Sequence, residues 1–158
     1  MNPPSESSAG QDAAGAARGA PRRLAIIVAG GSFNNLVQVA TLIRTAAGAG
    51  SVVRVLFRDA AVLSLRRDRI DGVAFSPEFA DREAATLALL EAADFEDLAG
   101  FLRDAKEHGD DVKLYACTSS LYYCDTQPDE LIAAIDGPRA LSAFLSEEVA
   151  TADTVLTF

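Results

Sequence analysis

The sequence predicts an α/β fold in which helices cover both faces of a parallel sheet. Short apolar runs alternate with longer stretches of helical composition, which is the pattern of successive β-α-β units. The run at 24–29, LAIIVA, contains no polar residue, as expected for a strand that is buried on both faces. Two glycines follow it and predict a tight turn into the next element.

Residues 33–47 predict a helix with a single narrow polar stripe. The stripe steps along the sequence by four, three and four residues, and its members are Asn34, Gln38, Thr41 and Thr45. A helix with so little polar surface should be largely covered, either by its own sheet or by another subunit. SVVRVLF at 51–57 predicts the second strand, AAVLSL a short helix, and Gly72 and Pro77 a loop.

The second half of the chain continues the same alternation. Residues 81–108 predict two helices with a break near Ala93 and Asp94, and VKLYA at 112–116 predicts the third strand. Further elements are expected as helices over 118–125, Pro128 to Ile135 and Pro138 to about Ala150, then a last strand at 154–158.

Residues 22–158 are predicted to form one domain, and residues 1–21 a disordered N-terminal tail. The tail is small, polar and turn-rich and lacks the apolar region of a secretory signal. Nothing later approaches the roughly 18 consecutive apolar residues of a membrane span. The net charge of −9, from 23 acidic and 14 basic residues, argues against a nucleic-acid-binding surface.

The chain offers few groups for metal or hydrolytic chemistry. His108 is the only histidine, which argues against a histidine-based metal site and a Ser-His-Asp triad. Two cysteines alone cannot complete a zinc site, so no metal is expected. With no export signal and so few cysteines, the thiols are expected to be reduced, in the cytoplasm.

The segment GGSFNN at 30–35 lies at the expected carboxyl edge of the sheet. Glycines before a helix could present backbone N–H groups to an anion. The segment lacks G-x-G-x-x-G and a Walker lysine, so a tight turn with Ser32 or Asn34 as helix cap is favoured. Gly30, Gly31, Ser32 and Asn34 remain candidates for one wall of a small pocket.

The stretch LYACTSSLYYCD at 114–125 contains both cysteines, Cys117 and Cys124. If both lay in one helix, their Cα atoms would be roughly 10 Å apart, whereas a disulfide tolerates about 7 Å. A thiol-disulfide switch stays open, because Cys117 is expected to precede the helix. Tyr122 and Tyr123 are interpreted as pocket wall or subunit contacts rather than catalytic groups.

A single working thiol at Cys117 is the favoured interpretation of this stretch. In parallel sheets, ligand-binding and catalytic residues lie at the carboxyl ends of the strands, which is where Cys117 is expected. Thr118, Ser119 or Ser120 can cap the following helix, and N–H groups there would stabilise a thiolate or a persulfide anion. On composition alone, a buried structural cysteine is an equal alternative.

Taken together, these features give the chain from Leu24 to Phe158 a resemblance to the DsrE/DsrF-like family, which includes the sulfur-relay TusBCD subunits and YchN-type proteins. The similar segments are LAIIVAGGSFNN, a second strand ending in VLF, KEHG before VKLYAC with its A-C-x-x-S stretch, and GPRALSAFLSEEVATADTVLTF. The resemblance implies a three-layer α/β/α fold near the flavodoxin type, usually assembled as dimers, trimers or hexamers. Residues 76–94 do not align, and Leu121, Tyr122 and Tyr123 replace the methionines of many relatives.

The resemblance also implies a function. Cys117 matches the active cysteine of the family, which holds sulfane sulfur as a persulfide and passes it to a TusA-like carrier protein. Cys124 matches no functional residue, and no metal or organic cofactor is required. The alternative is a non-enzymatic binding or assembly module with the same fold. A homo-oligomer is expected from the narrow polar stripe of the helix at 33–47. Whether the Cys117 sulfur is exposed to solvent in a pocket is the observation that best distinguishes the two functions.

Overall fold

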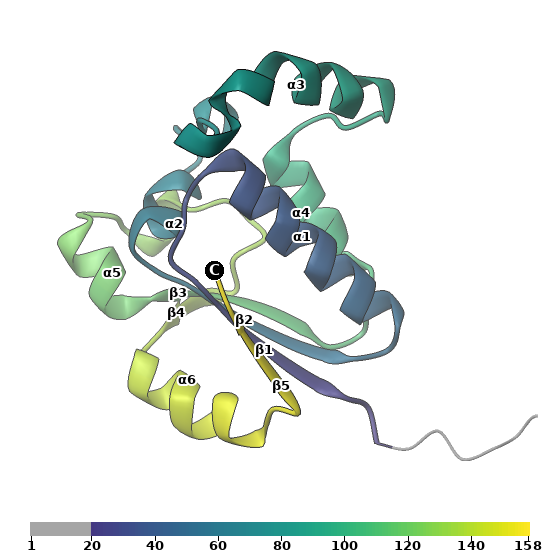
Figure 1. Cartoon of the computed structure of the whole chain (residues 1–158). Helices are drawn as coiled ribbons and strands as arrows, with labels where there is room; N and C mark the ends of the chain where they lie inside the picture. The colour runs from purple at the N-terminus through teal and green to yellow at the C-terminus, as the bar shows by residue number, and fades with distance from the viewer. Residues whose placement is uncertain (1–19) are drawn as a thin grey trace, which may run out of the picture.

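The computed structural model describes residues 20–158, so most of the predicted tail at 1–21 lies outside the described residues. Five strands form one fully parallel sheet in the order β4-β3-β2-β1-β5 (Figure 1). They are β1 (Arg23–Val28), β2 (Val52–Phe57), β3 (Val112–Cys117), β4 (Gly137–Arg139) and β5 (Thr154–Thr157). The order differs from the 2-1-3-4-5 order of flavodoxin.

Helices lie on both faces of the sheet, which confirms the predicted three-layer α/β/α fold class. They are α1 (Phe33–Gly48), α2 (Asp59–Ser64), α3 (Glu83–Ala92), α4 (Leu98–Glu107), α5 (Thr118–Tyr123) and α6 (Leu141–Glu147). Short 3₁₀ turns occur at Ile70–Gly72, Pro77–Arg82, Pro128–Glu130 and Val149–Thr151. Within residues 20–158, no helix has the length and apolar character needed to cross a membrane.

The handedness of the crossovers explains which helix covers which face. The chain moves across the sheet in one direction from β1 to β4, and right-handed crossovers then place α1 and α4 on the same face. The return from β4 to β5 runs in the opposite direction, so its helix, α6, must lie on the other face. Figure 1 shows this arrangement, with α1, α3 and α4 on one side of the sheet and α6 on the other.

Side-chain alternation divides each strand between these two faces. The face under α1 and α4 receives side chains such as Ile26, Val55 and Leu114, all fully buried in one large apolar cluster. The face under α6 has a much smaller buried cluster, whose members are Ala25, Leu56, Cys117 and Phe144.

The expected covering of the helix at 33–47 comes from its own chain. Gln38, Thr41 and Thr45 of the polar stripe are exposed, while α4 and the sheet bury residues on the remaining surface of α1. Because α4 and the sheet account for this burial, the stripe no longer calls for a second subunit. The homo-oligomer stays a prediction.

The predicted helix from Pro128 to Ile135 is wrong. Only a 3₁₀ turn forms, and Leu131 and Ile132 then lie alongside the end of α2 before a second turn at 133–134. The Ile132 N–H group donates to the Leu65 carbonyl at 3.0 Å, and Leu131 forms an antiparallel bridge with Arg66. These tertiary hydrogen bonds override the helical composition of LIAAI.

The predicted helix from Pro138 to Ala150 begins later and ends earlier than expected. Pro138 lies in β4, a three-residue strand that the sequence did not predict, and α6 spans only Leu141–Glu147. β4 is an edge strand of the sheet, where a residue without an N–H group is tolerated.

Candidate functional site

Cys117 is the last residue of β3 and the residue that precedes α5. Its side chain faces α6 and has no exposed surface. The thiol packs in the small cluster with Ala25, Leu56 and Phe144, and Phe144 of α6 is itself fully buried. The strand-end position is as predicted, but the sulfur is buried in this cluster and does not reach solvent.

Hydrogen-bond donors surround this buried thiol on the side of α5. Burial raises the pKa of Cys117, but backbone N–H groups of Ser120 and Ser119, the Ser120 hydroxyl and the charge of Arg58 together outweigh it. The net effect lowers the pKa of the thiol below its usual value. The surroundings therefore stabilise a negative charge on the sulfur although the sulfur is buried.

Side-chain capping of α5 by the hydroxyl residues was not found. Cys117 itself occupies the N-cap position, and no side chain there accepts a capping hydrogen bond. Thr118 and Ser119 are exposed, whereas Ser120 is fully buried. Of the three predicted hydroxyl residues, Ser119 and Ser120 face the thiol with their N–H groups, and Ser120 also does so with its side chain.

Ser120 also links α5 to the start of α2. Its hydroxyl accepts from the Asp59 N–H group at 3.0 Å and lies 3.0 Å from the Tyr123 hydroxyl. Its one proton is shared between two acceptors, Asp59 Oδ1 at 3.1 Å and the Cys117 sulfur. Asp59 holds a left-handed backbone conformation, with φ of 50°. Sequence reasoning missed Asp59, and its place directly after the second strand was the one available signal.

Cys124 stands in a different environment at the other end of α5. It is partly exposed, and its Sγ donates a long hydrogen bond of 3.8 Å to the Asp59 carbonyl. Burial and the nearby charge of Asp59 raise the pKa of this thiol. With six helical residues between the two cysteines, their Cα atoms are roughly 10 Å apart, so a disulfide would require α5 to unwind.

Part of the backbone around the GGSFNN segment is hydrogen-bonded within the chain. The N–H groups of Ala29 and Gly30 both donate to the Phe158 carbonyl, at 2.7 and 3.3 Å. The Phe33 N–H group donates to the Ala74 carbonyl at 2.8 Å. Since these donors are taken by the chain itself, they are unavailable to a phosphate.

The predicted capping of α1 is also wrong. Ser32 occupies the N-cap position without a side-chain capping hydrogen bond, and Asn34 Oδ1 instead accepts from the Ser76 N–H group at 2.9 Å. Asn34 therefore ties the start of α1 to the loop that precedes the Pro77–Arg82 turn.

Gly31 and Ser32 line a hollow of about 560 Å³ beside α2, together with Ala60 and Ser64, but Gly30 and Asn34 do not line it. The Gly31 carbonyl accepts from Ser64 at the end of α2. The Ser120 network reaches the start of the same helix, so the two groups of predicted site residues contact opposite ends of α2 and share no hollow.

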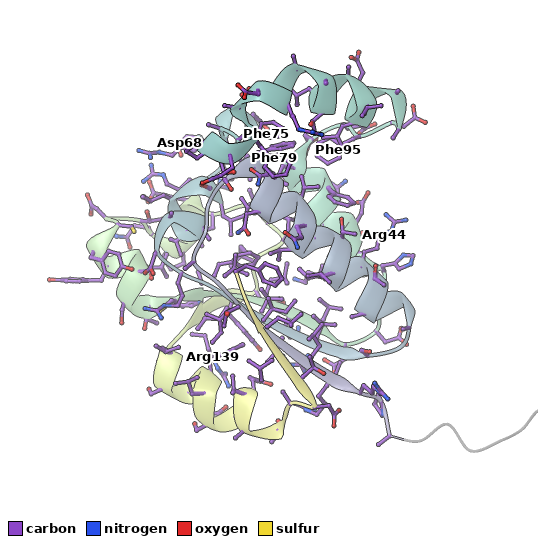
Figure 2. The ribbon with its side chains drawn as sticks, in the orientation of Figure 1. Arg44, Asp68, Phe75, Phe79, Phe95 and Arg139 are labelled. Atoms are coloured by element: carbon purple, nitrogen blue, oxygen red, sulfur yellow. The ribbon has the colours of Figure 1, made fainter. Side chains whose placement is uncertain are left out.

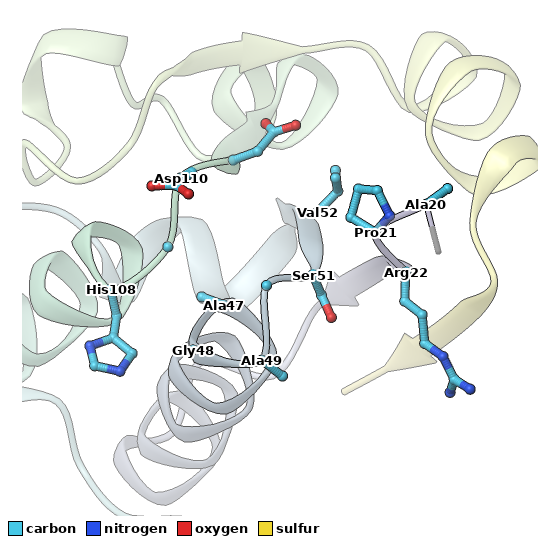
Figure 3. A pocket seen from close by; sticks show the side chains of 13 residues that line it. Ala20, Pro21, Arg22, Ala47, Gly48, Ala49, Ser51, Val52, His108 and Asp110 are labelled. Carbon is cyan, nitrogen blue, oxygen red and sulfur yellow. The ribbon is translucent and has the colours of Figure 1, made fainter. Parts of the chain in front are cut away.

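A larger hollow lies at the opposite end of the strands, where β1, β2 and β3 begin (Figure 3). It measures about 1030 Å³ and is lined by residues 47–52, 108–111 and 20–22. Neither cysteine lines any of the main hollows. Among residues 20–158, no group of three or more His, Cys, Asp or Glu side chains is placed to hold a metal ion.

Comparisons with known proteins support the fold and go no further. No model of a known protein family matches the chain, and no curated protein sequence matches it significantly. The chain is similar in structure to MTH1491, a protein of unknown function from Methanobacterium thermoautotrophicum. The TM-score is 0.55 at 13% sequence identity, and the match covers 85% of this chain and 98% of the other. At this identity, the likeness shows a shared fold.

Proposed function

We propose that this protein transfers sulfane sulfur through a persulfide on Cys117. The observation that supports the proposal is the contrast between the two thiols. Donor groups lower the pKa of the fully buried Cys117, whereas the pKa of the more exposed Cys124 is raised. A cysteine that serves only as packing would be expected to have a raised pKa, because burial disfavours the thiolate.

The proposed reaction needs no oxidant. The Cys117 thiolate attacks the outer sulfur of a donor persulfide, the donor S–S bond breaks, and the donor leaves as a thiolate. The Cys117 persulfide then gives its outer sulfur to a thiol of a TusA-like carrier protein and returns to the thiolate. The N–H groups of Ser119 and Ser120 stabilise the negative charge of both the thiolate and the persulfide of Cys117. The proposed reaction takes place in a reducing compartment such as the cytoplasm.

In this proposal, access to the sulfur requires α6 to move, because the thiol shares its buried cluster with Phe144 of α6. In this proposal the donor or carrier protein binds an arrangement in which α6 has shifted away from the sheet. A homo-oligomer is compatible with this step, since the open edge strand β5 lies on the side of the sheet away from β3.

The test is uptake of sulfur by the full-length protein. After incubation with inorganic polysulfide and removal of excess reagent, intact mass spectrometry should show the addition of one sulfur atom. The adduct should be lost in Cys117→Ser and retained in Cys124→Ser, and a reductant should release it. An adduct retained in Cys117→Ser, or no adduct after partial opening with low urea, would exclude Cys117 as the acceptor.

The complete burial of Cys117 favours a second candidate, a binding or assembly module that uses the fold without thiol chemistry. In that case Cys117→Ala should keep the fold and every interaction of the protein, since the thiol would serve only as packing. The two candidates are separated by the polysulfide experiment, because a module takes up no sulfur on Cys117 even when α6 is loosened.

A further inference from the structure

We infer that the hollow beneath α3 is a binding site for a small amphiphilic organic cation, with an apolar body and an ammonium group. The hollow measures about 600 Å³, which is within the usual range for small-molecule sites. It lies between α3, the start of α1 and the start of α4, and contains neither cysteine. The site is therefore independent of the proposed thiol chemistry.

The walls of the hollow are apolar. They are formed by Phe33, Ile70, Leu87, Leu90, Phe95 and Leu98. The rings of Phe33 and Phe95 meet edge to face, with centroids 5.9 Å apart. Phe33 also packs against Phe75 in a tilted arrangement, with centroids 4.7 Å apart. Figure 2 shows Phe75, Phe79 and Phe95 gathered beneath α3. An aromatic and aliphatic wall of this kind favours an alkyl or aryl group.

The remaining lining residues are all acidic: Asp71, Glu91, Glu96 and Asp97. No lysine, arginine or histidine lines the hollow, and none of these four carboxylates forms a salt bridge within residues 20–158. Asp97 is engaged as a helix cap, accepting from the Gly100 N–H group. The other three retain full capacity to attract a cation, and aromatic faces add to that attraction.

The helix that covers the hollow, α3, leaves its own apolar side chains exposed. No residue of α3 is buried, although seven consecutive residues, from Ala84 to Leu90, carry no charge. Leu87 is 44% exposed at the hollow and Leu90 is half-buried there. A ligand with an apolar body would cover these side chains, and its cationic group would meet the acidic rim.

The experiment uses a tryptophan as a local reporter. The chain contains no tryptophan, so Leu87→Trp would place a unique fluorophore at the hollow. Titration with octylammonium chloride, below the concentration at which it forms micelles, should change the fluorescence saturably. Calorimetry on the wild-type protein should give the same affinity, which controls for any filling of the hollow by the new side chain.

Three comparisons define the chemistry of the site. Octanoate should not bind, and octanol should bind more weakly than octylammonium. Hexylammonium should bind roughly tenfold more weakly, since two methylene groups are lost. Glu91→Gln with Glu96→Gln should weaken octylammonium binding about fivefold at low salt. Glu107→Gln with Asp129→Asn, which changes the net charge equally but lies outside the lining, should leave binding unchanged.

Three outcomes would overturn the inference. The first is no saturable binding in calorimetry. The second is equal weakening by the pocket pair and the control pair, which would show a general charge effect. The third is a dimer that forms through α3 and prevents binding of the cation, because the hollow would then be part of a subunit interface. Leu89 is 72% exposed on α3, so Leu89→Lys should break such a dimer.

Discussion

On the α1 side of the sheet, every strand from β1 to β3 contributes fully buried aliphatic side chains to one large core, whereas the α6 side combines charge with a small buried cluster. On that second side, Arg23, Arg54 and Arg139 from three strands converge on Glu148, just after α6. Arg139, labelled in Figure 2, lies between the sheet and α6.

The comparison shows how one parallel sheet separates stability from chemistry. Because successive side chains of a strand point to opposite faces, β3 contributes Leu114 and Ala116 to the large core and Tyr115 and Cys117 to the small cluster. The large core contains no residue of α6. The α6 side can therefore loosen at less cost in free energy, and the working thiol of the proposed function lies on that side.

Two phenylalanines give the sharpest test of this difference. Phe57 and Phe144 are both fully buried, Phe57 in the large core and Phe144 in the small cluster that contains Cys117. Phe57→Ala should lower the free energy of unfolding by about 4 kcal/mol, and Phe144→Ala by about 3 kcal/mol, because α6 can settle into the smaller space. Urea denaturation followed by circular dichroism measures both values.

The same pair should differ in the reactivity of Cys117. Phe144→Ala removes a fully buried side chain from the cluster that holds the Cys117 sulfur. Alkylation of Cys117 by iodoacetamide in the native protein should therefore accelerate by roughly tenfold or more. Phe57→Ala should leave this rate nearly unchanged, with Cys124 as the internal standard. Equal acceleration in both variants would mean that the thiol is reached by global unfolding, and the two faces would then not be independent.

The next largest effect concerns the ionic attachment of α6. Glu148 is 11% exposed and lies 3.3 Å from Arg54, 3.4 Å from Arg23 and 3.6 Å from Arg139. Glu148→Gln should cost about 2 kcal/mol of unfolding free energy, since partly buried guanidinium groups lose a charged partner. Glu147→Gln, at a neighbouring side chain that is 60% exposed, should cost about 0.5 kcal/mol or less. Similar losses in the two variants would contradict this attachment.

The smallest effect is a pH dependence on the α4 side. Burial raises the pKa of Asp136, but hydrogen bonds from the Leu114 N–H group, Lys106 and Lys113, with the charge of Lys106, outweigh it and lower the pKa overall. A lowered pKa in the folded state adds stability above the unfolded value of about 3.9, and this stability is lost as the pH falls through the folded value.

Asp136→Asn should therefore flatten the acid side of the stability profile, from about pH 5 downwards, while leaving the profile near neutrality parallel to that of the wild type. Thermal unfolding across pH 2–7 measures the profile. Asp104→Asn, at an exposed side chain of α4 paired with Arg103, is the control and should leave the acid slope intact.

The sequence predicted the parts of the fold that depend on local pattern. The strands at 24–29, 51–57 and 112–116 were found, because apolar runs of that length have few alternatives. β4 was missed, since Gly137, Pro138 and Arg139 form a strand only through pairing with β3. The bridge at Leu131 and Ile132 was missed for the same reason, because its partners come from the end of α2.

In the candidate site too, local features were predicted and features that depend on distant contacts were not. The position of Cys117 at a strand end was predicted, because the boundary between VKLYA and the next helix is local. Its burial could not be predicted, because this depends on the face to which the β4–β5 crossover brings α6. Asp59 was missed because its contact with Ser120 joins residues 61 positions apart.

The pairing of β1 with β5 joins the first and last strands of the described chain. Arg23 and Asp153 exchange backbone and side-chain hydrogen bonds across a separation of 130 residues. On a ribosome that adds about 5–20 residues per second, β1 would wait on the order of ten seconds for this partner. During synthesis the β1 edge is therefore an unpaired strand edge, where a nascent chain is most exposed to pairing with a strand from another molecule.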